Sequence, residues 1–187
     1  LIMSRLLGHV DQYWGVDTAP TSVANLRARA ETMGATDRVR IEQLAAHQIG
    51  QLPEQRFDVV VINSVAQYFP DERYLRAVLD AALQSLAPGG AIFVGDVRSL
   101  PLLRAFHTEV ALHDTAPDST AAELKAKIAR SVEDDAELVI APALFTDDLM
   151  DRDDVAAVSI VAKDSGDDNE MVRFRYDVIV TKASDEG

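Results

Sequence analysis

The sequence predicts an α/β fold: a mostly parallel sheet with helices on both faces and an antiparallel hairpin at the C-terminal end. Apolar stretches with strand character alternate with stretches of helical spacing through the first half of the chain, the pattern of sheets built from strand–helix–strand units. The run Val-Val-Val-Ile at 59–62 is β-branched throughout, as expected for a strand buried on both faces. Two later apolar stretches, 155–162 and 174–181, flank an acidic, glycine-containing turn at 164–169. They predict a hairpin that closes one edge of the sheet.

Length, charge and composition exclude several classes of protein. A chain of 187 residues predicts one domain, here 1–182 with a frayed tail at 183–187. The net charge is −13, from 31 acidic and 18 basic residues, and the arginines are not clustered, so nucleic acid is not expected as a partner. No apolar run approaches the roughly 20 residues of a membrane-spanning helix, and the sequence has no cysteine. It therefore predicts a cytoplasmic protein without a membrane partner, and the spacing of its histidines predicts no metal site.

The predicted elements of the first half follow one another without a linker. They are the remainder of a helix at 1–8, a strand at 13–17, a helix from Pro20 to Gly34, a strand at 39–44, the central strand ending at Asn63, a helix from Asp71 to Leu86 and a strand at 91–94. Thr18 can cap the helix that starts at Pro20, a residue tolerated in a first turn, and Gly34 suits its C-terminal end. The helix from Asp71 is ended by Pro-Gly-Gly at 88–90. Its apolar face consists of Leu75, Val78, Leu79, Ala82 and Leu86.

The second half is less regular. A helix is expected from Pro101, and Thr120 with Glu123 has the form of a capping box at the start of another. The acidic stretch 147–154 is typical of a solvated surface. The predicted hairpin completes the chain.

A ligand site is expected at the carboxyl ends of the strands, because open α/β sheets bind ligands beyond these ends. Asp17 ends the first strand, and the polar and aromatic residues 63–68 follow the central one. Asp17 can accept both hydroxyls of a ribose, or it can cap the following helix, for which aspartate is common. A glycine-rich turn would precede such a ribose-binding carboxylate, but Gly8 is isolated. The residues alone leave both interpretations open.

Several motifs occur in a fixed order: NSVAQYFP at 63–70, PGG at 88–90, GDVR at 95–98, Phe106-His107 and RYD at 175–177. In this combination the chain, from about 1 to 181, resembles the S-adenosylmethionine-dependent methyltransferase domains embedded in nonribosomal peptide synthetases. The PGG element marks only the wider methyltransferase class, whereas NSVAQYFP together with GDVR is more specific. The resemblance implies a Rossmann-like class I fold whose first strand and glycine-rich turn are absent from this sequence and precede its first residue.

The resemblance also implies a binding site for S-adenosylmethionine, with S-adenosylhomocysteine as the product. The implied cofactor contacts are Asp17, Thr18, Ala46, His47, Asn63, Ser64 and Val65. Asp17 would hold the ribose diol, and Ala46 and His47 would lie beside the adenine. Asn63 and Ser64 would meet the methionine part, with Val65 lining the same cleft.

The acceptor would lie against residues near the strand ends and on the helix after Pro101. Gln67, Tyr68 and His107 are the candidate catalytic residues, and Asp96 and Arg98 the candidate substrate-binding residues. His107 is the candidate base because histidine titrates near neutral pH. The other interpretations are that His107 packs or caps beside Leu103, that Asp96 and Arg98 pair with each other, and that Tyr68 is a core aromatic.

The implied reaction is N-methylation of an aminoacyl group tethered as a thioester to a carrier protein, with adjacent synthetase domains as partners. One alternative is a stand-alone methyltransferase that acts on oxygen, nitrogen or carbon of a small molecule. Another is a non-catalytic scaffold that retains the fold, and a nicotinamide-dependent dehydrogenase is a weaker fourth because its fold does not call for the closing hairpin. Fold alone does not separate these functions.

Overall fold

The computed structural model describes residues 2–53, 56–114, 116, 119–163 and 169–184. The chain forms two compact units, Leu1–Glu54 and Gln55–Gly187, which are described separately. The single domain expected over 1–182 stays a prediction. Of the expected frayed tail, 185–187 lie outside the described residues, and Ala183 donates its N–H to the Asp154 carbonyl at 3.0 Å. Among the residues described, no helix is both long and apolar enough to span a bilayer.

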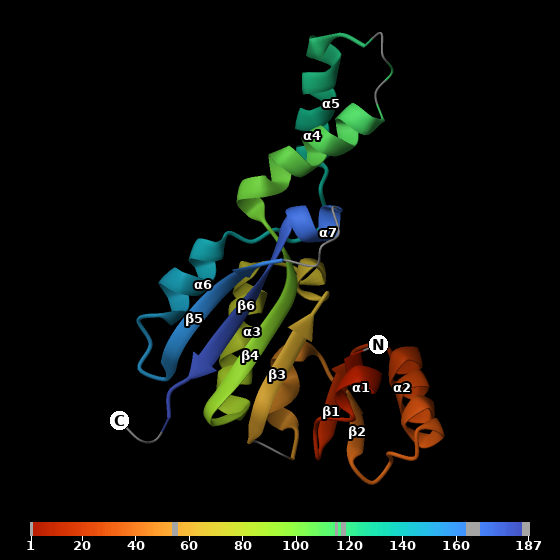
Figure 1. Cartoon of the computed structure of the whole chain (residues 1–187), viewed down its shortest axis with the longest axis vertical. Coiled ribbons are helices and arrows are strands. Elements are labelled where there is room, and N and C mark those ends of the chain that lie inside the picture. Colours follow the sequence, from red (N-terminus) through yellow and green to blue (C-terminus); the bar gives the residue numbers. More distant parts are fainter. Residues whose placement is uncertain (1, 54–55, 115, 117–118, 164–168, 185–187) are drawn as a thin grey trace. The chain divides into compact units, whose positions relative to one another are not determined.

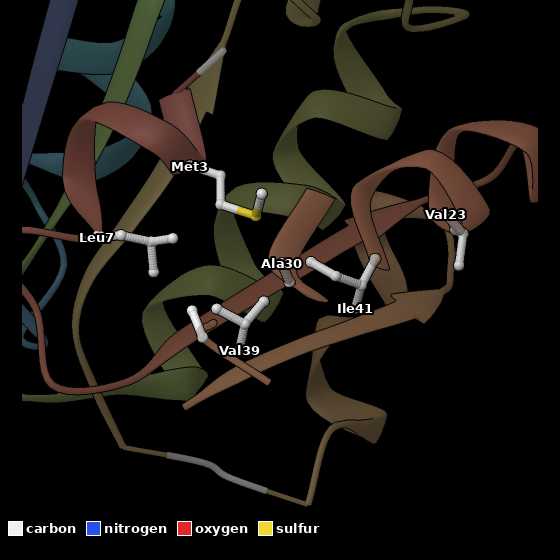
Figure 2. Close-up of a cluster of buried hydrophobic side chains, with 7 residues drawn as sticks. Met3, Leu7, Val23, Ala30, Val39 and Ile41 are labelled. Atoms are coloured by element: carbon white, nitrogen blue, oxygen red, sulfur yellow. The ribbon is translucent and has the colours of Figure 1, made fainter. Parts of the chain in front are cut away.

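The first unit is a two-stranded parallel sheet with helices packed on it (Figure 1). Its elements are α1 (Ile2–Leu6), β1 (Tyr13–Asp17), α2 (Pro20–Thr32), β2 (Val39–Gln43) and the 3₁₀ helix η1 (Ala46–Gln51). Apolar side chains from both helices and from β2 form its core (Figure 2). The buried members are Met3, Leu7, Val23, Ala30, Ala35, Val39 and Ile41.

The ends of α2 differ in how well the sequence predicted them. Gly34 has φ +63° and donates its N–H to the Glu31 carbonyl at 2.9 Å, so the predicted C-terminal glycine is confirmed. The expected cap by Thr18 is wrong, because Ala19 occupies the N-cap position and no side chain there hydrogen-bonds to the helix. Asp17 Oδ1 instead accepts the Ala19 N–H at 2.8 Å.

The second unit is built on a four-stranded mixed sheet in the order β3-β4-β6-β5 (Figure 1). Its strands are β3 (Phe57–Asn63), β4 (Leu86–Arg98), β5 (Val155–Ala162) and β6 (Arg175–Lys182). β3 and β4 are parallel, whereas β6 runs antiparallel to both β4 and β5. The predicted C-terminal hairpin at one edge of the sheet is therefore confirmed, although 164–168 of its expected turn lie outside the described residues.

Helices connect and cover this sheet. They are η2 (Ala66–Tyr68), α3 (Glu72–Ser85), η3 (Leu100–Leu102), α4 (Leu103–His113), α5 (Ala121–Glu133), α6 (Pro142–Leu149) and α7 (Glu170–Arg173). Asp71 accepts the Tyr74 N–H at 2.7 Å and caps α3, and the capping box of Thr120 and Glu123 starts α5 as predicted. The largest fully buried side chains of the unit come from these helices, the sheet strands and Ile140. They are Leu75, Val78, Leu79, Leu83, Ile92, Val94, Val97, Ile140, Phe145, Val178 and Val180.

Two predicted details of the strands are wrong. The helix α3 ends at Ser85, and Leu86 with the Pro-Gly-Gly segment belongs to β4, which is longer than the expected 91–94. The strand at 59–62 is not buried on both faces, because Val59 is 55% exposed and Val61 38%, while Ile62 is buried. In this sheet β3 is an edge strand and its side chains alternate between the two faces. The β-branched run therefore predicted the strand conformation correctly, but the prediction that both faces of the strand are buried is wrong.

Candidate functional site

The carboxyl ends of β3 and β4 bring candidate residues together. These strands are parallel, and their register places Asn63 opposite Gly95. Ser64 therefore comes beside Asp96, and its N–H donates to the Gly95 carbonyl at 3.1 Å. The residues at the carboxyl ends of these two strands thus lie side by side, at the edge where open α/β sheets bind ligands.

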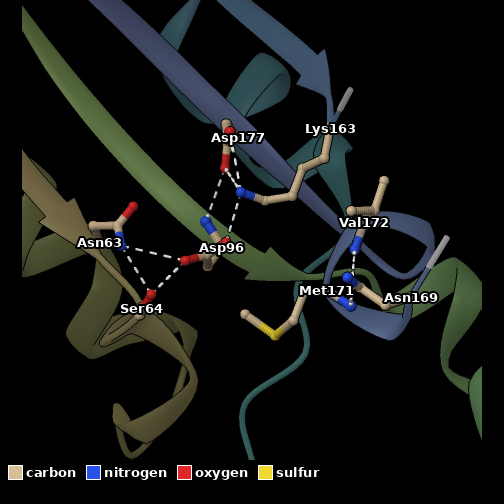
Figure 3. A network of polar contacts seen from close by, with 8 residues as sticks. All are labelled: Asn63, Ser64, Asp96, Lys163, Asn169, Met171, Val172 and Asp177. Atoms are coloured by element: carbon tan, nitrogen blue, oxygen red, sulfur yellow. Dashed lines mark hydrogen bonds and ion pairs between the residues drawn. The ribbon is translucent and has the colours of Figure 1, made fainter. Parts of the chain in front are cut away.

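Side chains at this edge form a hydrogen-bonded cluster (Figure 3). Asn63 donates from Nδ2 to Ser64 Oγ at 2.8 Å and to Asp96 Oδ2 at 3.2 Å, and the Ser64 hydroxyl donates to the same carboxylate oxygen. A Cβ at Gly95 would lie 2.1 Å from Asn63 Oδ1. Only glycine at this position leaves room for the Asn63 carboxamide to lie over β4.

The backbone is unusual at the same two positions. Ser64 has φ 57° and Asp96 has φ 62°, both in the left-handed region that non-glycine residues rarely adopt. Such conformations cost on the order of 1–3 kcal/mol each and persist only where surrounding contacts enforce them. Strain of this kind gathers at ligand sites.

The C-terminal hairpin completes the cluster with two residues that sequence reasoning gave no role. Lys163 Nζ lies 2.6 Å from Asp96 Oδ1 and 3.1 Å from Asp177 Oδ1, and Asp177 accepts the Asp96 backbone N–H at 2.9 Å. Burial acts to raise the pKa of Asp96, but hydrogen bonds from Lys163 and Ser64 outweigh it and lower that pKa. The expectation that Asp96 pairs with Arg98 is wrong, because its carboxylate bonds Lys163, Ser64 and Asn63.

Arg98 belongs to a second polar cluster. Its guanidinium donates two parallel hydrogen bonds to Asp135, each 2.7 Å long, and its Nη1 lies 3.3 Å from Glu137. The Arg98 and Asp135 side chains are only 11% and 9% exposed. The Arg98 hydrogen bonds hold the pKa of the Asp135 carboxyl well below its usual range, and a bond from His107 adds to the effect against the opposing influence of burial. Sequence reasoning missed Asp135, which stands beside another aspartate in an irregular segment.

His107 is fixed by the same carboxylate. Its Nε2 lies 2.8 Å from Asp135 Oδ2, and its ring makes an edge contact with Phe106 at a centroid distance of 5.0 Å. Because an ionised carboxylate only accepts hydrogen bonds, this contact assigns the proton to Nε2 and leaves Nδ1 as the accepting nitrogen of the neutral ring. His107 thus has a polar partner in Asp135, and the alternative in which it packs or caps beside Leu103 stays a prediction.

A cavity of about 320 Å³ lies beyond the carboxyl end of β4. Arg98 and Asp135 form part of its wall, together with charged and apolar neighbours. The remaining lining residues are Ser99, Leu102, Leu103, Phe106, Glu137, Val139, Glu170, Phe174 and Arg175. The lining combines rings and aliphatic groups with carboxylates and the guanidinium groups of Arg98 and Arg175, a mixture that suits a small molecule with an apolar and a polar part.

The predicted residues on η2 have unequal environments. Gln67 is 5% exposed, and its buried side-chain Oε1 has no hydrogen-bond partner among the described residues. A buried acceptor without a donor is costly unless a ligand or water supplies one. Tyr68 is 71% exposed, so its interpretation as a core aromatic is wrong, and Val65 is also exposed.

The other predicted cofactor residues lie in the first unit. Asp17 and Thr18 follow β1, and the Thr18 carbonyl accepts a hydrogen bond from Gln43 at 3.1 Å. Ala46 and His47 begin η1 directly after β2, again at a carboxyl end. Each is thus at the strand end where it was expected, and their joint role in cofactor binding stays a prediction.

Replacing Asp17 by alanine is expected to weaken S-adenosylmethionine binding at least about tenfold, or 1.4 kcal/mol, if its carboxylate also accepts the ribose hydroxyls. Calorimetric titration of the cofactor measures the change. Asp17→Asn is the matched variant. Its amide oxygen can still accept the Ala19 N–H, so a loss of affinity in this variant reports the carboxylate charge and not the start of the helix. Full affinity in both variants would leave Asp17 with its helix-start role alone.

Comparisons with known proteins agree on the class of fold. A family described as a methyltransferase domain matches residues 2–92. The chain is 39% identical over 183 residues to CymA of Salinispora arenicola, named as a probable non-canonical nonribosomal peptide synthetase, covering 98% of this chain and 2% of that protein. It is 33% identical over 178 residues to the chondramide synthase of Chondromyces crocatus, covering 95% of this chain and 5% of that protein. The chain thus corresponds to a small segment of each relative.

Solved structures show the same architecture. The N-methyltransferase NodS from Bradyrhizobium japonicum, solved with S-adenosylhomocysteine, superposes with a TM-score of 0.57 at 16% identity, covering 98% of this chain and 72% of that one. At this identity the likeness concerns the fold. The predicted class I architecture with an antiparallel C-terminal hairpin is confirmed.

Proposed function

We propose that the chain is a class I S-adenosylmethionine-dependent methyltransferase domain, and that it N-methylates an aminoacyl group held as a thioester on a carrier protein; its likeness to segments of nonribosomal peptide synthetases supports the proposal. The observation that carries the proposal is the likeness over 98% of the chain to a segment that makes up 2% of a synthetase. Adjacent synthetase domains and a carrier are the partners this implies. The absence of cysteine fits the expected cytoplasmic location.

The residues at the β3 and β4 ends fit the methionine end of the cofactor. They supply the amide of Asn63, the hydroxyl of Ser64 and the shielded carboxylate of Asp96. The backbone is strained at Ser64 and Asp96, and Gly95 has no side chain to fill the space over β4. Bound S-adenosylmethionine supplies an electrophilic methyl group on a sulfonium. Asn63 and Ser64 would bind that end.

The cavity beyond β4 fits the acceptor. Phe106 and Phe174 offer apolar surface, and Glu170 is a carboxylate that could receive an amino group, whereas Glu137 lies 3.3 Å from Arg98. Alignment and exclusion of water supply most of the acceleration in a displacement of this kind. The attacking amine must also lose a proton. His107 Nδ1 is the candidate acceptor of this proton and the unpartnered Gln67 Oε1 a candidate acceptor for an amine N–H; both residues stand outside the cavity lining, although His107 contacts the lining residue Asp135.

The proposal predicts that a carrier-loaded aminoacyl thioester is methylated at least about tenfold faster than the same amino acid in solution, since short tethers give effective concentrations in the millimolar range. Mass spectrometry of both acceptors after incubation with isotope-labelled cofactor measures the two rates. The same carrier loaded with an N-methylated aminoacyl group is the control for transfer to nitrogen. Equal or faster methylation of the free amino acid would favour a stand-alone enzyme, and methylation of neither would favour a scaffold.

A further inference from the structure

We infer that Lys163 and Asp177, both on the C-terminal hairpin, are positioning residues for methyl transfer: they hold Asp96, and through it Asn63 and Ser64, in the arrangement that receives the methionine end of the cofactor. The inference rests on the cofactor site of the proposed function. It does not depend on which acceptor is methylated.

The polar contacts connect all four strands at one end of the sheet (Figure 3). Asn63 and Ser64 at the end of β3 donate to the Asp96 carboxylate on β4. The Asp96 N–H donates to Asp177 on β6, and Lys163, directly after β5, contacts both carboxylates. The two hairpin residues therefore fix the backbone and the side chain of Asp96 separately.

Lys163 is placed between two carboxylates, those of Asp96 and Asp177, which would otherwise repel each other, and Arg175 adds a second, more distant positive charge near Asp96. The side chains are largely shielded, with Lys163 19% and Asp96 13% exposed. Removing the ammonium would leave Asp96 and Asp177 as neighbouring like charges, so that one would protonate or turn away. Either change would withdraw the acceptor that Asn63 and Ser64 share.

The strained backbone argues for a positioning role over simple stabilisation. Ser64 and Asp96, which face each other across β3 and β4, both have left-handed φ angles. An ion pair that served stability alone would need neither conformation, and the surrounding contacts must offset their cost. Asp177 supplies one of these contacts directly, because it accepts the N–H of the strained Asp96.

The test compares Lys163→Met, Lys163→Arg and Asp177→Asn with Lys182→Met as the matched control. Lys182 lies at the opposite end of β6 on the same hairpin and donates to the carbonyls of Leu83 and Leu86, each at 2.8 Å. Lys163→Met and Asp177→Asn are expected to weaken S-adenosylmethionine binding by about 10–100-fold, by analogy with the loss of residues that hold metal ligands in place. Lys163→Arg should restore most of the affinity because it keeps the charge.

The pH dependence gives a readout that structural loss would not move. Against the effect of burial, hydrogen bonds from Lys163 and Ser64 and the charge of Arg175 lower the pKa of Asp96, so its ionised form persists as the pH falls. Loss of Lys163 removes part of this lowering, while Ser64 and Arg175 remain. The acid-side decline of cofactor affinity should therefore begin at higher pH in Lys163→Met than in the wild type, and Lys182→Met should leave it unchanged. Wild-type affinity and pH profile in folded Lys163→Met, or an equal loss in Lys182→Met, would overturn the inference. Cofactor binding without methylation of any aminoacyl carrier would instead contradict the proposed function.

Discussion

Asp135→Asn is expected to destabilise the second unit by about 3–5 kcal/mol, the cost of removing one partner from a buried ion pair. Arg98 is only 11% exposed and loses the carboxylate that accepts its two 2.7 Å hydrogen bonds. The asparagine amide oxygen can accept one of these bonds, but the guanidinium loses its buried counterion and keeps only the more exposed Glu137, 3.3 Å away. Urea denaturation of the wild type and the variant measures the difference.

Asp80→Asn is the matched control, because Asp80 pairs with Arg152 at a site where its side chain is 48% exposed. Exposed pairs contribute about 0–1 kcal/mol, so this variant should stay near the wild type. The double variant Arg98→Met/Asp135→Asn should recover part of the loss, since it removes the guanidinium charge that has lost its buried partner. A loss in Asp135→Asn no larger than that in Asp80→Asn would contradict a buried, energetically coupled pair.

The effect of Asp135 also has a defined pH dependence. Arg98 lowers the pKa of Asp135 in the folded protein, so its contribution to stability is present above the unfolded pKa of about 3.9 and disappears as the pH falls through the lower folded value. The difference in unfolding free energy between wild type and Asp135→Asn should therefore be constant near neutral pH and shrink below about pH 4. A constant difference throughout acid would indicate that packing, and not charge, is responsible.

The parts of the fold that the sequence predicted are those with local signals. The capping box at Thr120, the glycine after α2 and the apolar strands of the hairpin depend on residues close in sequence. The burial of the β3 valines was predicted wrongly. β-branched residues indicate strand conformation, but they do not indicate whether the strand has a neighbouring strand on each side. Burial is set by sheet order, which no local pattern contains.

The same limit applies to the site. Asn63, Ser64 and Asp96 could be expected to meet, since parallel strands end at the same edge of a sheet. Lys163 and Asp135 could not, because each comes from a distant segment and looks, in sequence, like any other surface charge. Their partners depend on the antiparallel return of β6 and on the segment between α5 and α6, which brings Asp135 to Arg98 and His107.

His107→Ala is expected to lower the single-turnover methylation rate by about 10²–10⁴-fold, the range for loss of a general base, while cofactor affinity stays near the wild-type value. The reason is the contact with Asp135, which holds Nε2 as the donor and leaves Nδ1 to take the proton of the attacking amine. Rapid-quench measurement with a carrier-loaded acceptor gives the rate, and calorimetry gives the affinity.

His107→Gln separates this role from a purely structural one. Its side-chain amide can still donate to Asp135 and keep that carboxylate and Arg98 in place, but it cannot accept a proton near neutral pH. If His107 is the base, both variants lose the rate while His107→Gln keeps the stability of the wild type. If His107 only supports Asp135, His107→Gln restores the rate, and the proton must leave by another route. If both variants have the wild-type rate from about pH 6 to 9, neither role is correct. Loss of a general base, or of the residue that holds Asp135 in place, should lower the rate in this range, where an imidazole can accept a proton.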